Sequence, residues 1–247
     1  MRFSLITICK NSQRTLRRTL ESVLAQKTLP DEYIFVDGNS TDRTQNIIDE
    51  YVPRLGDKGV KAISLKQVDA PGEAGIPVAW NQGIKTATGD VIALLNSDDW
   101  YEPMALESVA TAFQQSPDAG VVSAPVNFLD QVGKVVSTSF PKCLCLLPIL
   151  MPVPHPGLFV KKSTYDRLGL YDTSYRISAD YDFVWRLAKN KVEFAYIKEP
   201  QVNMELGGLA NANRKPARDE TRNIATKHQP YNPIPYIAWI ARTILNR

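Results

Sequence analysis

The sequence predicts an α/β fold of the Rossmann type, with a mainly parallel central sheet covered by helices on both faces. Short apolar segments alternate with amphipathic helical segments over the first hundred residues, as in successive βαβ units. The 247 residues are 44% hydrophobic and 22% charged, which is an ordinary composition for a globular protein with a large core. No internal repeat or low-complexity tract interrupts the alternation.

Hydrophobic spacing places the elements of the first half. The first helix has apolar side chains at Leu16, Leu20, Val23 and Leu24, which share one helical face. Ser40 is a suitable N-cap for the second helix. Strands are expected at residues 3–9, 32–37, 61–68 and 90–96, and helices at 12–26, 38–52 and 77–87.

The second half is less regular. We expect a helix from Pro103, a hairpin of strands around Gly133, a late strand and a mostly loop-like tail. The expected ranges are strands within 120–130 and 134–140, a strand and helix within 155–171, a helix at 178–190, a strand at 192–197 and a short helix at 236–245. Residues 1–205 therefore form one domain, with halves at 1–100 and 101–205, followed by a basic loop and helix at 206–247.

Charge and cysteine content exclude several classes of protein. The formal net charge of +3 gives no overall field for nucleic acid, although seven Lys/Arg and two acids follow residue 213. Cys9, Cys143 and Cys145 suggest neither a disulfide framework nor a metal site. The sequence shows no signal peptide and no apolar run of the roughly 20 residues that a membrane span needs. We expect a cytoplasmic protein.

Polar clusters follow three of the predicted strands. They are residues 9–11 (Cys-Lys-Asn), residues 37–40 (Asp-Gly-Asn-Ser) and residues 96–99 (Asn-Ser-Asp-Asp). The carboxyl ends of parallel strands meet at one sheet edge, where open α/β sheets bind ligands. Three clusters at one edge favour a ligand site over isolated helix caps.

The adjacent carboxylates of Asp98 and Asp99 need something to offset their repulsion. They could form an N-cap with a solvated neighbour. They could also bind a divalent cation, because Mg²⁺ and Mn²⁺ take carboxylate oxygens together with phosphate oxygens and water. The residues alone leave both interpretations open.

Four segments together resemble glycosyltransferase family 2. They are "SLITICKN", "IFVDGNSTDRT", "NQGIKTATGDVIALLNSDD" and "SADYDFVWRL", in the family's order between about residues 3 and 190. The resemblance implies a GT-A fold with a smaller acceptor-side region, and an inverting enzyme of the kind that builds bacterial surface polysaccharides such as colanic acid. It further implies Mg²⁺ or Mn²⁺, a nucleotide diphosphate sugar, expected to be a UDP-sugar, and a glycan or lipid-linked acceptor.

The resemblance also assigns donor-side residues. Asp37 corresponds to the aspartate that reads the base, and Thr7 and Asn11 would line the base and ribose. The Asn-Ser-Asp-Asp segment occupies the place of the Asp-x-Asp motif, with Asn96 where many members have aspartate. Either Asp98 or Asp99 would ligate the metal. The expected donor- and metal-binding residues are Thr7, Asn11, Asp37, Asn81, Asn96, Asp98 and Asp99, with Gly83 beside the donor loop.

On the acceptor side, the resemblance assigns the catalytic base to Asp180. Ala179 replaces the family's usual glutamate, and Asp182 is a rival for the same role. Because Asp180 would begin a helix, the helix dipole is expected to lower its pKa. His155 would touch the diphosphate or the acceptor, or belong to a structural loop.

Two alternatives to this enzyme remain at this point. A sugar nucleotidyltransferase has a similar architecture but needs a Gly-rich phosphate loop, which residues 9–15 lack. A nucleotide- or glycan-binding module without catalysis is compatible with Asn96 and Ala179. The apolar helix near the C-terminus would either lie on an anionic membrane or pack on the sheet. The glycines at 207 and 208 would belong to a lid.

Overall fold

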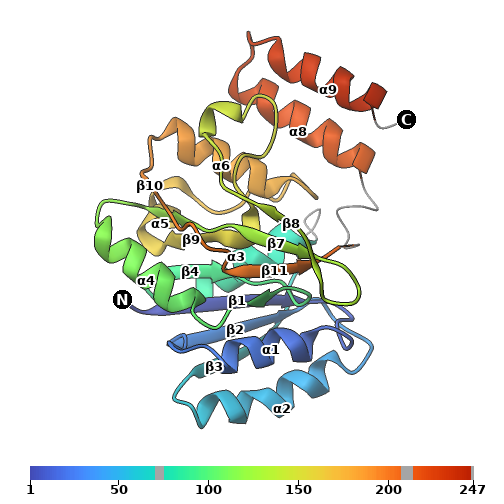
Figure 1. Cartoon of the computed structure of the whole chain (residues 1–247). Coiled ribbons are helices and arrows are strands. Elements are labelled where there is room, and N and C mark those ends of the chain that lie inside the picture. The colour runs from blue at the N-terminus through green and yellow to red at the C-terminus, as the bar shows by residue number, and fades with distance from the viewer. Residues whose placement is uncertain (70–74, 207–213, 246–247) are drawn as a thin grey trace.

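The computed structural model of the chain describes residues 1–69, 75–206 and 214–245, and among them a seven-stranded sheet forms the centre (Figure 1). In spatial order its strands are β10 (Phe194–Tyr196), β6 (Val121–Ser123), β9 (Leu158–Lys161), β4 (Val91–Leu94), β1 (Phe3–Cys9), β2 (Glu32–Asp37) and β3 (Lys61–Lys66). β9 runs antiparallel to both its neighbours, and the other pairs are parallel. The predicted mainly parallel sheet is confirmed.

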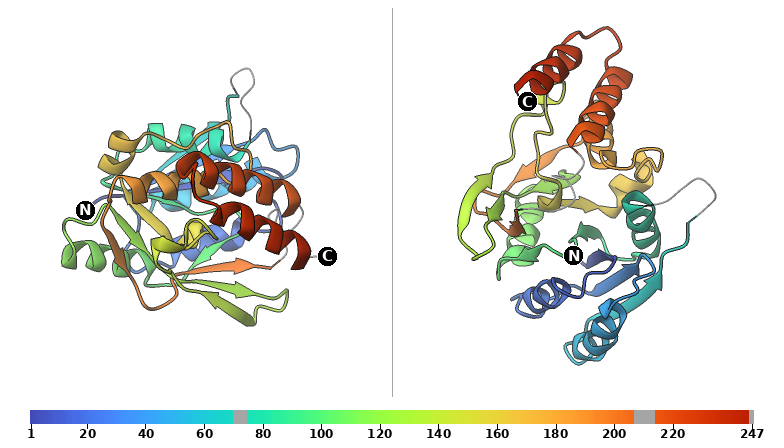
Figure 2. Two further views of the ribbon diagram at one scale, coloured as in Figure 1. Left: turned by 90° about the horizontal axis from the view of Figure 1, so that it is seen from above. Right: turned by 90° about the vertical axis from the view of Figure 1, so that its right-hand side faces the viewer.

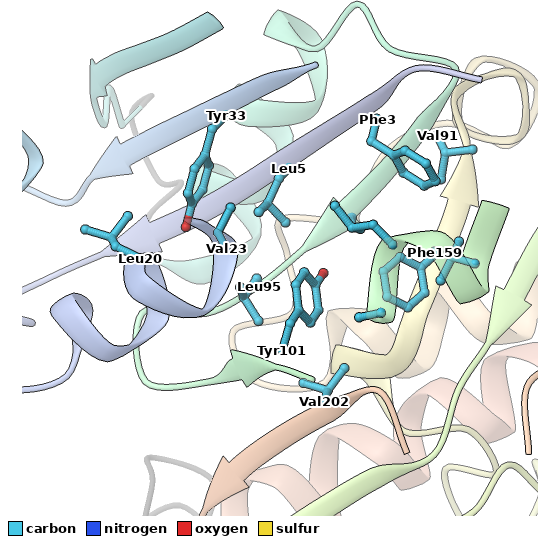
Figure 3. Packing of buried hydrophobic residues seen from close by; sticks show 14 of the residues in the cluster. Phe3, Leu5, Leu20, Val23, Tyr33, Val91, Leu95, Tyr101, Phe159 and Val202 are labelled. Atoms are coloured by element: carbon cyan, nitrogen blue, oxygen red, sulfur yellow. The ribbon is translucent and has the colours of Figure 1, made fainter. Parts of the chain in front are cut away.

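Helices cover both faces of this sheet, as predicted. On one face lie α1 (Leu16–Leu24), α2 (Thr44–Gly56) and α4 (Ala105–Gln115), and on the other lie α3 (Ile76–Thr86), α5 (Lys162–Leu168) and α6 (Ala179–Lys189). Alternate strand residues enter the two resulting cores, so that Leu5 packs with the first set of helices and Ile6 with the second. Figure 3 shows the first core, in which α1 packs on β1 and β2 through Leu20 and Val23.

A smaller sheet lies beside the second half of the large one. Its strands in order are β5 (Trp100–Tyr101), β11 (Val202–Glu205), β7 (Val126–Leu129) and β8 (Val135–Ser139). The predicted hairpin around Gly133 is formed by β7 and β8. The expected strand within 120–130 is instead two strands in different sheets, with Pro125 between them. Proline cannot donate a ladder hydrogen bond, which suits the point where the chain changes sheet.

The C-terminal region differs most from the prediction. In place of a loop, residues after 213 form α8 (Arg214–His228), and α9 (Ile234–Leu245) follows. α8 packs on α6, and α9 lies on α8 rather than on the sheet (Figures 1 and 2). The helix α8 is hard to recognise because only two of its described side chains, Ile224 and Ala225, are buried.

The loop that leads from the small sheet to β9 contains two short 3₁₀ helices, Leu144–Leu146 and His155–Gly157. The structure pairs Cys143 with Cys145 in this loop, and Cys9 is free and buried. The sequence analysis does not expect this local pairing.

The strand order creates a topological switch between β1 and β4. The chain passes from β1 through α1 to β2 on one side, whereas β3 connects through α3 to β4 on the other side of β1. Because α1 and α3 lie on opposite faces, the carboxyl ends of β1 and β4 are the place where an open sheet of this kind forms its ligand crevice. The loops at 9–12 and 95–99 border it.

Candidate active site

The three polar clusters meet at the carboxyl edge of the sheet. The hydroxyls of Ser12 and Ser97 are 2.7 Å apart and link the loops after β1 and β4. The backbone N–H of Asn11 donates to Ser40 Oγ over 2.9 Å, and Asn11 Oδ1 accepts from the N–H of Thr41 at the same distance. Asn11 has a φ of 51°, a left-handed conformation that asparagine tolerates well. The prediction that these three loops meet at one edge of the sheet is confirmed.

Asp37 ends β2 and its carboxylate is fully buried. One oxygen accepts a hydrogen bond of 2.5 Å from Ser40 Oγ, and the other lies 2.5 Å from Lys66 Nζ. The Lys66 side chain is half exposed, so it forms the outer cover of the carboxylate. Asp37 therefore lies just below the surface of the crevice.

The aspartate pair after β4 consists of two very different carboxylates. Asp98 is exposed, whereas Asp99 is only 1% exposed and accepts a hydrogen bond of 3.1 Å from Asn96 Nδ2. Burial, reinforced by the charge of Asp98, raises the pKa of Asp99 well above its ordinary value. Asn96 thus supports the buried member of the pair, and Asp98 alone faces solvent.

Arg18 is a neighbour of the pair that the sequence does not reveal. Its guanidinium donates to the Asp98 carbonyl over 3.2 Å, pairs with Glu205 at 2.9 Å and lies 3.7 Å from the centre of the Trp100 ring. Trp100 is thus a rim residue held by a cation–π contact. Tyr101 is in the core, with 3% of its surface exposed.

The residues at this edge fit a divalent cation bound mainly through its substrate. No group of three His, Cys, Asp or Glu side chains capable of holding a metal occurs among residues 1–69, 75–206 and 214–245. Mg²⁺ and Mn²⁺ commonly use one or two carboxylates and take their remaining ligands from phosphates and water. Asp98 is available for such a role, whereas Asp99 would first have to leave its buried contact with Asn96.

Asp180 lies in the first turn of α6 and accepts a hydrogen bond of 2.8 Å from the Tyr181 N–H. Burial raises its pKa, opposed by the charge of nearby His155. The expected lowering by the helix dipole is therefore wrong, because desolvation outweighs the dipole here. A carboxylate with a raised pKa is a better proton acceptor than an ordinary surface aspartate.

His155 belongs to the same cluster. Its Nε2 lies 3.2 Å from the Tyr171 hydroxyl, and its ring centre lies 4.5 Å from that of Trp80. Burial lowers its pKa, with the charge of Asp180 opposing, so the ring is held toward its neutral form. His155 thus lines the Asp180 side of the site within an aromatic environment.

Both carboxylate oxygens of Asp182 already have a partner side chain. Arg186 Nε lies 2.9 Å from one oxygen and His228 Nε2 lies 3.0 Å from the other, and the residue is 2% exposed. Burial alone raises the pKa of Asp182, but these two partners together lower it. Asp182 is therefore a structural ion-pair residue that joins α6 to α8, and it is poorly placed to act as the rival base.

Two expected donor residues do not face the crevice. Thr7 is fully buried, 2.8 Å from the Tyr33 hydroxyl, and donates to the Leu95 carbonyl over 2.7 Å. Asn81 uses both halves of its amide on the backbone of Tyr171, at 2.8 and 2.9 Å. Both residues form internal cross-links in this structure, and their donor roles stay predictions.

Gly83 also has a packing role. A Cβ at this position would lie 2.5 Å from Ile6 Cγ2, so glycine allows α3 to approach β1. The proposed lid glycines at 207 and 208 lie outside the described residues.

Glu220 of α8 is the functional neighbour that sequence reasoning missed. Its carboxylate accepts the backbone N–H groups of Arg176, Ile177 and Ser178 at 3.0, 2.9 and 2.8 Å. These residues immediately precede α6 and Asp180. Because the partners are 42 to 44 positions apart in sequence, no local pattern indicates the contact.

Comparison with known proteins gives a consistent result. A sequence model described as glycosyl transferase family 2 matches residues 4–176. A PGL/p-HBAD biosynthesis glycosyltransferase from Mycobacterium bovis (strain BCG / Pasteur 1173P2) is 26% identical over 215 residues, covering 85% of this chain and 79% of the relative. An uncharacterized glycosyltransferase from Mycobacterium tuberculosis (strain CDC 1551 / Oshkosh) is 31% identical over 193 residues, covering 75% and 68%.

Solved structures share the fold. The crystal structure of S. aureus TarS 1-349 in complex with UDP-GlcNAc superposes with a TM-score of 0.71 at 18% identity, covering 92% of this chain and 66% of that one. The structure of TarS 1-349 without that ligand gives 0.70 at 17% identity, covering 92% and 65%. No helix within the described ranges is long and apolar enough to cross a membrane. The matched segment spans well over half of the chain, which therefore belongs to glycosyl transferase family 2 and is a glycosyltransferase.

Proposed function

We propose that this glycosyltransferase is a metal-dependent, inverting enzyme that transfers a sugar from a UDP-sugar. The observation that carries the proposal is the asymmetric carboxylate pair at the switch point, with Asp98 exposed and Asp99 buried against Asn96. An exposed carboxylate at this crevice suits a cation shared with a diphosphate. The TarS complex with UDP-GlcNAc, a protein of the same fold, supports the uridine donor.

In this proposal Asp37 and Asn11 receive the nucleoside, and Asp98 holds Mg²⁺ or Mn²⁺ on the diphosphate. Lys66 covers the Asp37 carboxylate, so it has to move aside or share that carboxylate with the base. When bound, the metal neutralises charge that develops on the leaving diphosphate. Asn96 and Asp99 shape the loop that presents Asp98.

Asp180 acts as the general base on the acceptor side. Its carboxylate takes the proton of the acceptor hydroxyl as that oxygen attacks the anomeric carbon from the face opposite the diphosphate. The anomeric configuration is inverted in this single displacement. His155 and Trp80 line the space beside this carboxylate and would contact the acceptor or the donor sugar.

We further propose a glycan or lipid-linked acceptor in bacterial polysaccharide synthesis, and a cytoplasmic place of action at the inner membrane face. The resemblance to glycosyltransferase family 2 suggests this class of acceptor, and a bacterial relative named PGL/p-HBAD biosynthesis glycosyltransferase supports a biosynthetic role. The near-neutral net charge gives no support to a nucleic-acid partner.

A donor panel tests the proposal. UDP-, GDP- and dTDP-sugars are incubated with Mg²⁺, Mn²⁺ or a chelator, and nucleotide release is measured. We expect release from a UDP-sugar that the chelator abolishes, and loss of metal-supported UDP binding in Asp98→Asn. Asp180→Asn should still bind UDP while its turnover falls by about 10²–10⁴-fold. Full activity of Asp98→Asn in the presence of chelator would refute the metal assignment.

A further inference from the structure

The outer face of α9 is an apolar surface at the end of the molecule. Five large side chains, 49–82% exposed, lie along it: Tyr236, Ile237, Ile240, Ile244 and Leu245. In the described part of α9 the one charged side chain is Arg242, which is partly buried. Figures 1 and 2 show α9 at the outside of the fold, packed on α8 and next to the loop that contains residues 148–149.

The inner face holds α9 in place and explains why the apolar side chains point outward. Trp239 Nε1 donates to Asp219 over 2.8 Å, and the guanidinium of Arg222 lies 4.7 Å from the centre of the Trp239 ring. Arg218 donates to the Arg242 carbonyl over 2.9 Å. These polar and cation–π contacts fix one side of α9 on α8, so the opposite side faces solvent.

The hairpin of α8 and α9 carries an excess of positive charge, because seven Lys/Arg and two acids follow residue 213. Arg218, Arg222 and Arg242 line a small cleft between α8, α9 and residues 148–149. Within the described ranges Arg218 and Arg222 pair with no carboxylate, and their hydrogen-bond acceptors there are neutral: the Arg242 carbonyl and the Asn223 side-chain oxygen. Ile149, whose carbonyl accepts from Arg242, is a further exposed apolar residue in the neighbouring loop.

We propose that the α8–α9 hairpin binds the surface of an anionic lipid membrane. The exposed face of α9 would enter the boundary between headgroups and acyl chains, and the excess positive charge of the hairpin would be attracted to the anionic headgroups. A basic helix pair with an uncharged aromatic and aliphatic face has the chemistry that such a surface recognises. The inference does not rest on the proposed donor, because the interaction needs no nucleotide.

A second copy of the chain is the less suitable partner. A helix of 12 residues is about 18 Å long and about 10 Å wide, so one face offers a few hundred Å² at most. A stable specific interface buries about 800 Å² on each partner. The excess positive charge of the hairpin would also repel a second copy, whereas an anionic membrane attracts it.

Vesicle flotation of the full chain tests the proposal. We expect the protein to float with vesicles of phosphatidylglycerol and phosphatidylcholine, to stay behind with phosphatidylcholine alone, and to detach as salt rises. Ile237→Ser combined with Ile240→Ser should lower the partition coefficient at least tenfold. Val132→Ser combined with Val136→Ser, two exposed valines at the β7–β8 hairpin, is the matched control and should bind like the wild type.

Several results would overturn the proposal. They are failure of the folded wild type to float, equal flotation of the α9 variant, or binding independent of lipid charge. A dimer in sedimentation velocity that the α9 substitutions abolish, without vesicle binding, would assign the face to a second copy. If the α9 variant unfolds, the lipid-charge and salt series on the wild type decides the question alone. A folded wild type that hydrolyses a UDP-sugar but does not bind the vesicles would refute this inference and leave the proposed function standing.

Discussion

Removing the Glu220 carboxylate should impair catalysis more than donor binding. This side chain holds three consecutive backbone N–H groups at 2.8–3.0 Å, directly before the helix that carries Asp180. Hydrogen bonds to a charged group contribute about 1.5–3 kcal/mol each, but water can replace them at this half-buried position. We therefore expect Glu220→Ala to lower the free energy of unfolding by about 1–3 kcal/mol in total.

The effect on turnover follows from displacement of the base. A shift of about 1 Å in a catalytic group can cost roughly 10²-fold, so kcat should fall by about 10- to 100-fold. The KM for the donor should change little, because the crevice that receives the donor is built by the loops after β1, β2 and β4. Glu220→Gln keeps the shape and one acceptor oxygen, and should give an intermediate loss.

A pH profile separates this positioning role from simple loss of stability. The charge of Glu220 is among the causes that raise the pKa of Asp180, after burial. Its removal should move the acid limb of the kcat profile to lower pH, which mere destabilisation would not do. Glu50→Ala is the matched control, since it also removes a helix carboxylate paired at the surface, with Arg17. An unchanged kcat and acid limb in Glu220→Gln would refute this reasoning.

Three further predictions concern single residues. The pKa of Asp180 is raised, so the wild-type rate should begin to fall on acidification at a higher pH than an ordinary aspartate with pKa of about 3.9 would give, as a kcat–pH profile would show. Asp182→Asn should cost on the order of 3 kcal/mol in urea unfolding. The pKa of Asp182 is lowered in the folded state, so its contribution to the free energy of unfolding is complete above about pH 4 and is lost as the pH falls through the folded pKa. The difference in the free energy of unfolding between Asp182→Asn and the wild type should therefore become smaller at acidic pH. Gly83→Ala should lower the midpoint of thermal unfolding, because overpacking against Ile6 costs about 1–3 kcal/mol. Gly59→Ala is the comparison: its new methyl group has open space around it, so any loss of stability there comes from the positive φ of 81° and not from overpacking.

Sequence reasoning predicted what depends on periodicity. The short apolar segments at 3–9 and 32–37 are predicted to be strands, and the structure forms strands there. The convergence of the loops at 9–11, 37–40 and 96–99 also followed, because parallel strands end at a common edge. These inferences need only local patterns and the topology of βαβ units.

Side-chain direction was harder to infer. Thr7 and Asn81 have polar side chains that could bind a nucleotide sugar. Both instead form hydrogen bonds with internal groups, Thr7 with the Tyr33 hydroxyl and Asn81 with the backbone of Tyr171. A buried polar side chain that is already paired is indistinguishable by sequence from an exposed one that awaits a ligand. The different burial of Asp98 and Asp99 is of the same kind, since adjacent residues of identical chemistry face opposite environments.

The acceptor side is where local reasoning fails, because its supports come from a distant segment. The family match ends at residue 176, whereas Asp180 and Asp182 lie beyond it and are supported by Glu220 and His228 of α8. That helix is mostly polar, so its packing on α6 rests on a few buried side chains and on these two charged contacts. The same hairpin turns the apolar face of α9 outward. One C-terminal element thus contacts the loop before the proposed base and presents the proposed membrane surface, so changes in this element should affect turnover and membrane binding through separate residues.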